Sequence, residues 1–543
     1  MKKLLRNLLI IFGSLFAVVA VMALALVIAP GINFFGVQFI SYNGGGVDET
    51  ARVNGLSGVS DHIYVHVEDV PVNLVFDQTE ALTANLLQHY TGYTSTAKTL
   101  LDMSTTNRRT TIFAQGYNRF LFGSNEEGNG LNLSIPKTFN GHITIESSNA
   151  DVTFSGYDDI TLKDVFIKTT GQIKFNNRVS MNNLNLEINS AYVEIPERVV
   201  VRQKIGVVSK TGSVCIKGAQ SSDIKFESNA GTLMFVECNN LEVVGRNAKL
   251  EGATEIAPKV KGNAKVVIGR SVVLSEVGGN ADIATKRGDI VVGESAGVYS
   301  GEYNLSTMSG KITMHGKYTN SALSVVTKSG DISIGNIVMA EIKSDRGKIA
   351  IEQTDKVNII GGIGNITIAE VKSAANITSK RGSVTLSSEN GKAIGNAEIT
   401  TTGGRISIYN ALGDSYKLAT STGVVNFYSA STGGQQLEIT SKHGKVNGFG
   451  ICGKTTITTN ADVNLEVARV NGLISVNSNN GDCNIALDDN ARNAYYNLES
   501  VKSNIVSAPN LTAKTKIYNT VPENGAEEKT IMVRTKWGKI NVE

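Results

Sequence analysis

One short pattern recurs along most of this chain at intervals of about 20 residues. It runs apolar–x–Ser/Thr–x–x–Gly–x–apolar–x–apolar, and residues 325–334, 342–351 and 377–386 are three of its copies. A repeat of this length indicates a stacked architecture, because each unit can bury its apolar face only against its neighbours. The repeat therefore constrains the shape of the protein strongly and its chemistry weakly.

Positions in each copy are numbered here from its glycine, which is position 0. Positions +2, +4 and −5 are apolar, as in Ile332, Ile334 and Val325 around Gly330. Alternation with a period of two predicts strands whose apolar side chains face a narrow core. The glycine is expected at a corner, where a positive φ is tolerated. The hydroxyl at −3, Thr327 in this copy, should point inward and hydrogen-bond the backbone of the corner.

The repeat predicts an all-β fold, a β-solenoid or parallel β-helix of about 20 coils with one N-terminal transmembrane helix. A unit of this size is too long for a hairpin, so its strands should pair between coils about 4.8 Å apart. Continuous repeats begin at Ile143, and the copies between 232 and 287 are degenerate. The 55 glycines and few aromatic residues suit short strands joined by turns.

The amino terminus combines the basic residues Lys2, Lys3 and Arg6 with an uncharged, mostly apolar run at 8–29. A helix of that length rises about 33 Å, enough to cross a membrane. A cleaved signal peptide is the alternative, but its apolar stretch is usually about 7–15 residues long. We therefore expect a single-pass cell-membrane protein whose N-terminal helix contacts the membrane and whose C-terminal domain is extracellular, at the cell surface.

The sequence divides into five segments. These are a cytoplasmic basic tail (1–7), a transmembrane signal anchor (8–29), a stalk or linker (30–60), an N-terminal β cap with the first coils (61–140) and the β-solenoid repeat domain with its C-terminal cap (141–543). Within the cap, residues 63–67 and 72–76 alternate as a pair of strands, and 82–89 is assigned to a short helix. The last unit, around Trp537, is expected to cap the C-terminal end.

Basic residues recur at positions −2 and −1 of the corner. Stacking would align them in a strip, here called the corner edge: Lys286, Arg287, Lys328, Arg346, Lys380, Arg381 and Lys442. One interpretation is a ligand-facing strip for anionic surface polymers such as teichoic acids or acidic glycans. The other is that turn tips must be polar and that lysine prevents edge aggregation. The net charge of only +3 does not indicate nucleic-acid binding.

The sequence offers little support for catalysis. Polysaccharide-active β-helices need carboxylates clustered across successive coils, whereas Asp289, Asp331 and Asp482 share one position in coils that are mostly separated by other residue types. His62 and His66 are four residues apart with no third ligand evident. We therefore predict a protein that is not an enzyme, with no catalytic, cofactor-binding or metal-binding residues and no cofactor.

The four cysteines are Cys215, Cys238, Cys452 and Cys483. An exported protein makes a disulfide the first expectation. However, the four lie at different offsets from their corners, so no two share a stacked position. Cys483 replaces a core Ile or Val and is interpreted as a small buried hydrophobic residue.

Two strand segments, Leu131–Lys137 and Ile143–Glu146, followed by the run of Ser/Thr-x-x-Gly-x-Ile-x-Ile units, resemble the bacterial "putative adhesin" β-strand-repeat family. The resemblance covers roughly residues 60–543. It implies an exported or membrane-anchored solenoid without an assigned activity.

Together these observations predict a non-catalytic, membrane-anchored extracellular β-solenoid that acts as a surface adhesion or interaction module. Its partner would be a cell-surface polysaccharide or protein. A structural cell-envelope spacer or self-assembling scaffold is the alternative, and a polysaccharide-active β-helix enzyme is the third hypothesis.

Overall fold

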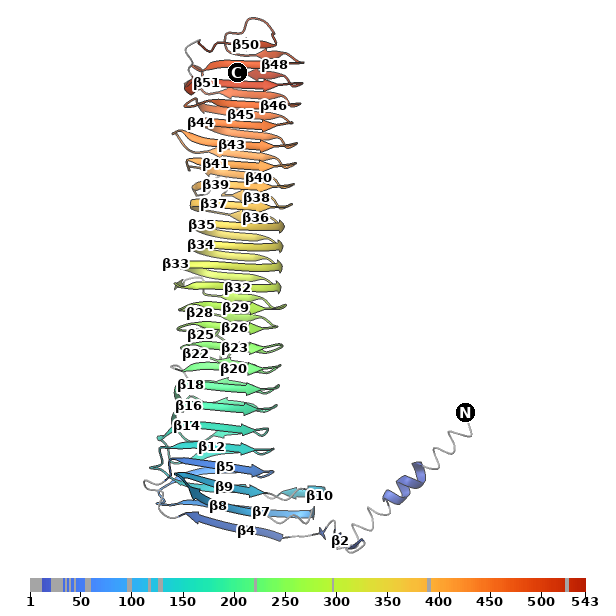
Figure 1. The fold of residues 1–543 in the computed structure, drawn as a ribbon, viewed down its shortest axis with the longest axis vertical. Helices are drawn as coiled ribbons and strands as arrows, with labels where there is room; N and C mark the ends of the chain where they lie inside the picture. Colours follow the sequence, from blue (N-terminus) through green and yellow to red (C-terminus); the bar gives the residue numbers. More distant parts are fainter. Residues whose placement is uncertain are drawn as a thin grey trace. The chain divides into compact units, whose positions relative to one another are not determined.

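The computed structural model describes residues 12–20, 33–34, 37–38, 41–42, 45–53, 60–94, 100–115, 119–125, 130–218, 222–294, 297–387, 392–522 and 527–543. The chain divides into two compact units, Met1–Val236 and Glu237–Glu543. Parallel strands stack in both units (Figure 1). The all-β solenoid fold is thus confirmed, with about 17 turns where the sequence predicted about 20.

In unit 1, two columns of parallel strands form the sides of the solenoid. One column contains, in stacking order, β9 (Arg109–Gln115), β5 (His62–Glu68), β12 (His142–Ser147), β14 (Ile160–Thr169), β16 (Val179–Ile188), β18 (Val199–Ser209) and β20 (Asp223–Ser228). The other contains β11 (Gly130–Pro136), β6 (Val72–Asp77), β13 (Val152–Gly156), β15 (Ile173–Phe175), β17 (Tyr192–Ile195), β19 (Ser213–Ile216) and β21 (Thr232–Phe235). The pair at 63–67 and 72–76 is therefore two strands of different columns.

Unit 2 repeats this plan, and its turn corners lie between the two columns. The strands before the corner are β23 (Leu241–Gly245), β26 (Ala264–Ile268), β29 (Ala281–Thr285), β32 (Glu302–Ser309), β37 (Val371–Ser379), β39 (Ile394–Thr401), β41 (Ser415–Thr420), β43 (Gln435–Ser441) and β46 (Ile474–Ser478). The strands after it are β27 (Val272–Leu274), β30 (Ile290–Val292), β36 (Ile366–Ile368), β38 (Val384–Leu386), β40 (Ile406–Ala411), β42 (Val425–Ser429), β45 (Val463–Arg469) and β47 (Cys483–Leu487). Four long strands run from one corner toward the next and belong to both columns: β33 (Ile312–Ser329), β34 (Ile332–Arg346), β35 (Ile349–Ile363) and β44 (Val446–Thr459).

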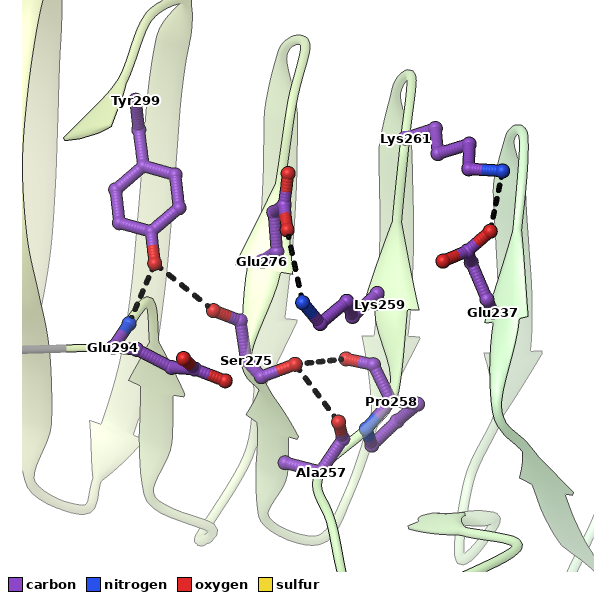
Figure 2. A network of polar contacts seen from close by, with 9 residues as sticks. All are labelled: Glu237, Ala257, Pro258, Lys259, Lys261, Ser275, Glu276, Glu294 and Tyr299. Atoms are coloured by element: carbon purple, nitrogen blue, oxygen red, sulfur yellow. Dashed lines mark hydrogen bonds and ion pairs between the residues drawn. The ribbon is translucent and has the colours of Figure 1, made fainter. Parts of the chain in front are cut away.

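A third, narrow sheet is present where the repeats are degenerate. It consists of β22 (Glu237–Cys238), β25 (Lys259–Val260) and β28 (Glu276–Val277). Figure 2 shows Lys259 and Glu276 on neighbouring strands pointing toward one another, 3.5 Å apart, with Lys261 and Glu237 also paired. The Tyr299 hydroxyl donates to the Ser275 carbonyl (3.1 Å) and accepts from the backbone N–H of Glu294 (2.7 Å). Ion pairs and hydrogen bonds thus connect neighbouring turns in the segment where the repeats are degenerate.

The core matches the predicted alternation. Ile332, Ile334 and Val325 around the Gly330 corner are at most 1% exposed. The same positions in the following turns align strand to strand, for example Ile332 with Ile349 and Val325 with Ile342. Burial of β-branched side chains in columns removes apolar surface that one turn alone would leave in water.

Each unit contains strands whose order in the stack does not follow chain order. In unit 1, β5 and β6 lie between the β9/β11 level and the β12/β13 level. In unit 2, the C-terminal strands β51 (Thr530–Thr535) and β52 (Ile540–Val542) lie between β46/β47 and the earlier strands β48 (Tyr495–Ser500) and β49 (Ile505–Ser507). The expectation that the Trp537 unit forms the cap is therefore wrong.

Antiparallel strands cover the outermost levels. In unit 1, β8 (Leu100–Thr106) pairs with β9, and β7 (Leu82–Thr94) pairs with β11, β4 (Gly45–Val53) and β10 (Arg119–Asn125). In unit 2, β50 (Ile517–Asn519) pairs with β48. The expected helix at 82–89 is wrong, because Leu82, Ala84 and Leu86 alternate inward at period two and are fully buried in a strand.

Residues 12–20 form a helix with exposed side chains, and the other residues of the predicted 8–29 anchor lie outside the described part of the chain. Among the described residues, none of the helices has the length and apolarity needed to cross a membrane. In the predicted stalk, short strands are described at β1 (Asn33–Phe34), β2 (Val37–Gln38), β3 (Ser41–Tyr42) and β4.

Candidate functional site

At several corners the hydroxyl at position −3 hydrogen-bonds the backbone, as the sequence predicts, whereas the buried Thr327 hydroxyl has no hydrogen-bond partner among the described residues. The Ser441 side chain donates to the Gly444 carbonyl and accepts from the Gly444 N–H, both at 2.9 Å. Thr420 accepts from the Gly423 N–H at 3.0 Å. Because these backbone groups are buried and outside the strand ladders, the hydroxyl row has a structural role and is not a row of nucleophiles.

The glycine at the corner is required mainly by close stacking. A Cβ on Gly382 would lie 1.5 Å from the Gly364 carbonyl oxygen of the preceding turn. The sequence predicts a positive φ at the corner glycine. Gly330 (φ 154°) and a few other corner glycines have a positive φ, whereas Gly382 does not. Contact between turns therefore explains why glycine recurs even where any residue could adopt the backbone conformation.

The structure places all seven corner-edge residues in unit 2, with exposed side chains. None of the seven forms an ion pair with another described residue. They do not form a continuous strip, however: Lys328 is level with Asp345 and Arg346 is level with Ile363 in neighbouring turns. The seven residues come from five corners, of which only those of Lys328 and Arg346 belong to successive turns, so the corner edge is interrupted along the stack.

The three aspartates considered for catalysis have a local structural role. The Asp331 carboxylate accepts the backbone N–H of Lys348 in the next turn at 2.8 Å, and Asp289 and Asp482 accept those of Lys311 (2.7 Å) and Lys539 (2.8 Å). Each occupies position +1 and holds the +1 amide of the following turn. This geometry explains why acidic residues recur there without clustering into a pair suited to acid–base chemistry.

The two predicted histidines lie on the outer face of β5, as expected, and face partners on both neighbouring strands. His62 hydrogen-bonds Thr144 (2.8 Å), and its ring lies edge-on to His142 with centroids 6.1 Å apart. Burial, Arg109 and His142 lower the pKa of His62 below its ordinary value. His66 lies 3.6 Å from Glu146. No group of three or more metal-ligating side chains occurs within the described ranges.

The four cysteines are all buried, and none of them forms a disulfide. Cys483 is 0% exposed, and burial raises the pKa of its thiol to about 12. The Cys452 thiol donates to the carbonyls of Ser431 and Gly433 at 3.0 Å each. Cys483 therefore packs as a small hydrophobic residue, as predicted.

A concavity on unit 2 lies at positions the repeat pattern does not include. It is a groove of about 660 Å³ on the outer face of seven successive strands, β32, β33, β34, β35, β37, β39 and β41. We call it the outer groove. Its outward-facing residues are those at position −8 (Glu302, Ala322, Met339, Lys356, Ala374, Asn396 and Ser415) and at −6 (Asn304, Ser324, Glu341, Asn358, Asn376, Glu398 and Lys417).

Small side chains accompany the groove. The inward position −7 between the two outward columns is Tyr303 and Tyr416 at the first and last strands, and Ala340, Ala375 and Ala397 at three strands between them. The pairing of β35 with β37 also shifts register next to the groove. Thr354 pairs with Val371, whereas Lys356, two residues later, pairs with Ala374, three residues later. Smaller core residues and a local kink are consistent with a hollowed sheet surface at this point.

Two asparagine side chains of the groove differ from the asparagines at position +3 of unit 2. Asn447 and Asn464, at position +3, belong to a ladder of amides that donate to one another across turns, at 2.8 Å and 3.0 Å. The side chains of the neighbouring groove residues Asn358 and Asn376 have no hydrogen-bond partner among the described residues. Their amides therefore keep their donors and acceptors free for a ligand.

Sequence reasoning missed this site because it followed only positions −5 to +4. A signal was present in the sequence: side-chain volume at −7 falls sharply between Tyr303 and Tyr416. The repeat itself draws attention to the residues that the fold requires, whereas the groove is built from residues that the fold leaves variable.

Stacked parallel turns with buried hydroxyl corners define a β-solenoid repeat protein. The chain belongs to the Toastrack DUF4097 family, whose model matches residues 60–292 and 365–543. No curated protein matches it.

Two crystal structures are similar. One is a "putative cell adhesion protein" from Clostridium sporogenes, with 9% identity and a TM-score of 0.19 over 50% of this chain and 100% of that one. The other is a "putative adhesin" from Parabacteroides merdae, with 12% identity and a TM-score of 0.18 over 61% of this chain and 98% of that one. Identities and TM-scores this low carry no information on function.

Proposed function

We propose that this protein is a non-catalytic interaction module, exposed at the cell surface and held to the membrane by residues 8–29. The outer groove carries the proposal. It crosses seven strands on an exposed face and contains unpartnered amides, the combination expected of a binding site for an extended ligand. The hydroxyl row and the aspartates, in contrast, are used by the fold itself.

Binding to whole cells and to isolated surface polymers tests this function. The fragment 45–543 should be retained by at least one cell surface or polymer fraction. Ala374→Trp, which fills the groove, should reduce retention. Thr378→Trp, at an exposed position on the same strand, should not. Absence of binding to every cell and polymer tested would refute an adhesion role.

The location is tested separately. A fusion reporter after residue 60 should be accessible to protease added to intact cells, and the protein should remain in the membrane fraction after high-salt washing. Release of a shortened soluble chain would support cleavage of the 8–29 segment instead.

A further inference from the structure

We propose, on the basis of the proposed function, that the outer groove binds a linear, uncharged glycan along the stacking direction. Each of the seven strands contributes one residue at position −8 and one at −6, so outward side chains, which differ in type from strand to strand, recur at the strand spacing. Seven strands at about 4.8 Å spacing extend roughly 29 Å. A site of this length with repeating contacts suits a polymer better than a compact small molecule.

The hydrogen-bonding groups of the groove match hydroxyl and acetamido groups. The Asn358 and Asn376 amides are in register on neighbouring strands and have no partner in the described structure. The Asn396 side-chain oxygen accepts the Ser415 N–H at 3.0 Å, which leaves its amide donors available. An amide both donates and accepts, as a sugar hydroxyl does, so the neighbouring Asn358 and Asn376 amides can each hydrogen-bond a sugar.

The charges of the groove argue against an anionic ligand. Three carboxylates, Glu302, Glu341 and Glu398, face two lysines, Lys356 and Lys417, which gives a net charge of −1 (2 − 3). Glu398 is paired with Lys417 at 3.5 Å, and Glu341 with Lys343 at 3.3 Å. A polyanion would meet these carboxylates and would have to compete with Glu398 for Lys417, so it is disfavoured relative to a neutral chain.

The apolar residues of the groove suit the C–H faces of sugar rings. Ala322 and Ala374 are half-buried, and the neighbouring Met339 side chain is 51% exposed. Methyl and thioether groups beside free amides provide apolar contact together with a few directing polar groups, as in other sites for neutral ligands.

Calorimetric titration of the purified full chain with chitohexaose, cellohexaose and hexagalacturonate tests the proposal. We expect at least one neutral hexasaccharide to bind, and hexagalacturonate to bind at least about tenfold more weakly. Ala374→Trp should abolish binding of the neutral hexasaccharide, whereas Thr378→Trp should leave it unchanged. Circular dichroism and thermal unfolding of both variants should match those of the parent chain.

Three outcomes would overturn the proposal: neither neutral hexasaccharide binds, hexagalacturonate binds as tightly as the neutral ones, or Ala374→Trp binds like the parent. If the parent chain is retained by cells but ignores the neutral hexasaccharides, the glycan assignment fails and the interaction function stands. If the parent chain binds neither cells nor the neutral hexasaccharides, both the glycan assignment and the interaction function fail.

Discussion

The corners and the outer groove both belong to the stacked turns of unit 2, yet they differ in what their side chains do. At the corner, Ser441 and Thr420 each satisfy buried backbone groups, and Gly382 stacks closely against the preceding turn. In the groove, the side-chain amides of Asn358 and Asn376 make no hydrogen bond to another described residue. The positions that repeat most regularly therefore serve the fold, and the irregular outward positions are those available for binding.

The largest effect should come from charging the inward columns. Ile349→Asp combined with Ile351→Asp places two carboxylates where the native side chains are at most 3% exposed. Each buried charge without a partner costs several kcal/mol, so the neighbouring turns should lose their protease resistance. Ala350→Asp, at the exposed position between them, is the control and should remain resistant. Equal digestion patterns for both variants would refute the stacked core.

Substitution of a corner glycine should have the next largest effect. Gly382→Val places a Cβ that would lie 1.5 Å from the Gly364 carbonyl oxygen, so the turns must separate. We expect a loss of about 3 kcal/mol or more in urea unfolding. Ala374→Val in the groove should change stability by less than about 1 kcal/mol. Comparable losses for the two would remove the distinction between corner and groove.

The hydroxyl row allows a matched comparison at one repeat position. Thr420 accepts the Gly423 N–H, whereas the buried Thr327 hydroxyl has no hydrogen-bond partner. Thr420→Val should therefore lose about 1–2 kcal/mol, while Thr327→Val should be neutral or stabilising. The same unfolding experiment measures both. If the two variants lose the same stability, the corner hydrogen bond is not the reason for the Ser/Thr preference.

A smaller effect is expected on the outer face of β5 in unit 1, where the side chains pair with one another. The folded-state pKa of His62 is lowered, so the unfolded chain binds more protons as the pH falls below the ordinary value of 6.5. The contribution of His62 to stability is therefore complete above that value and decreases at lower pH. Thermal unfolding at several pH values should show His62→Gln to be less acid-sensitive than the parent. An unchanged pH profile would exclude His62 as a contributor.

The repeat was sufficient to predict the solenoid, its inward columns and the corner hydroxyls, because period-two alternation around a glycine has few structural solutions. It did not predict that β51 and β52 lie between β46/β47 and β48/β49. Strands with the same alternation fit any level of the stack, so the sequence pattern does not fix their order. The helix expected at 82–89 is wrong because Leu82, Ala84 and Leu86 alternate at period two, which is typical of a strand.

The basic corner residues were visible in the sequence because they share an offset from the glycine. The groove was not, because it depends on small residues such as Ala375 at −7 and on a register shift that no local pattern encodes.

Lysine acylation of the full chain, with and without a surface polymer that retains it, tests the central claim most directly. The corner and the groove each contain exposed lysines, so mass spectrometry can compare them in one experiment. The account predicts that bound polymer protects Lys356 and Lys417 in the groove, while Lys286, Lys328, Lys380 and Lys442 at the corner edge remain reactive. Protection of the corner lysines with Lys356 and Lys417 still reactive would contradict it.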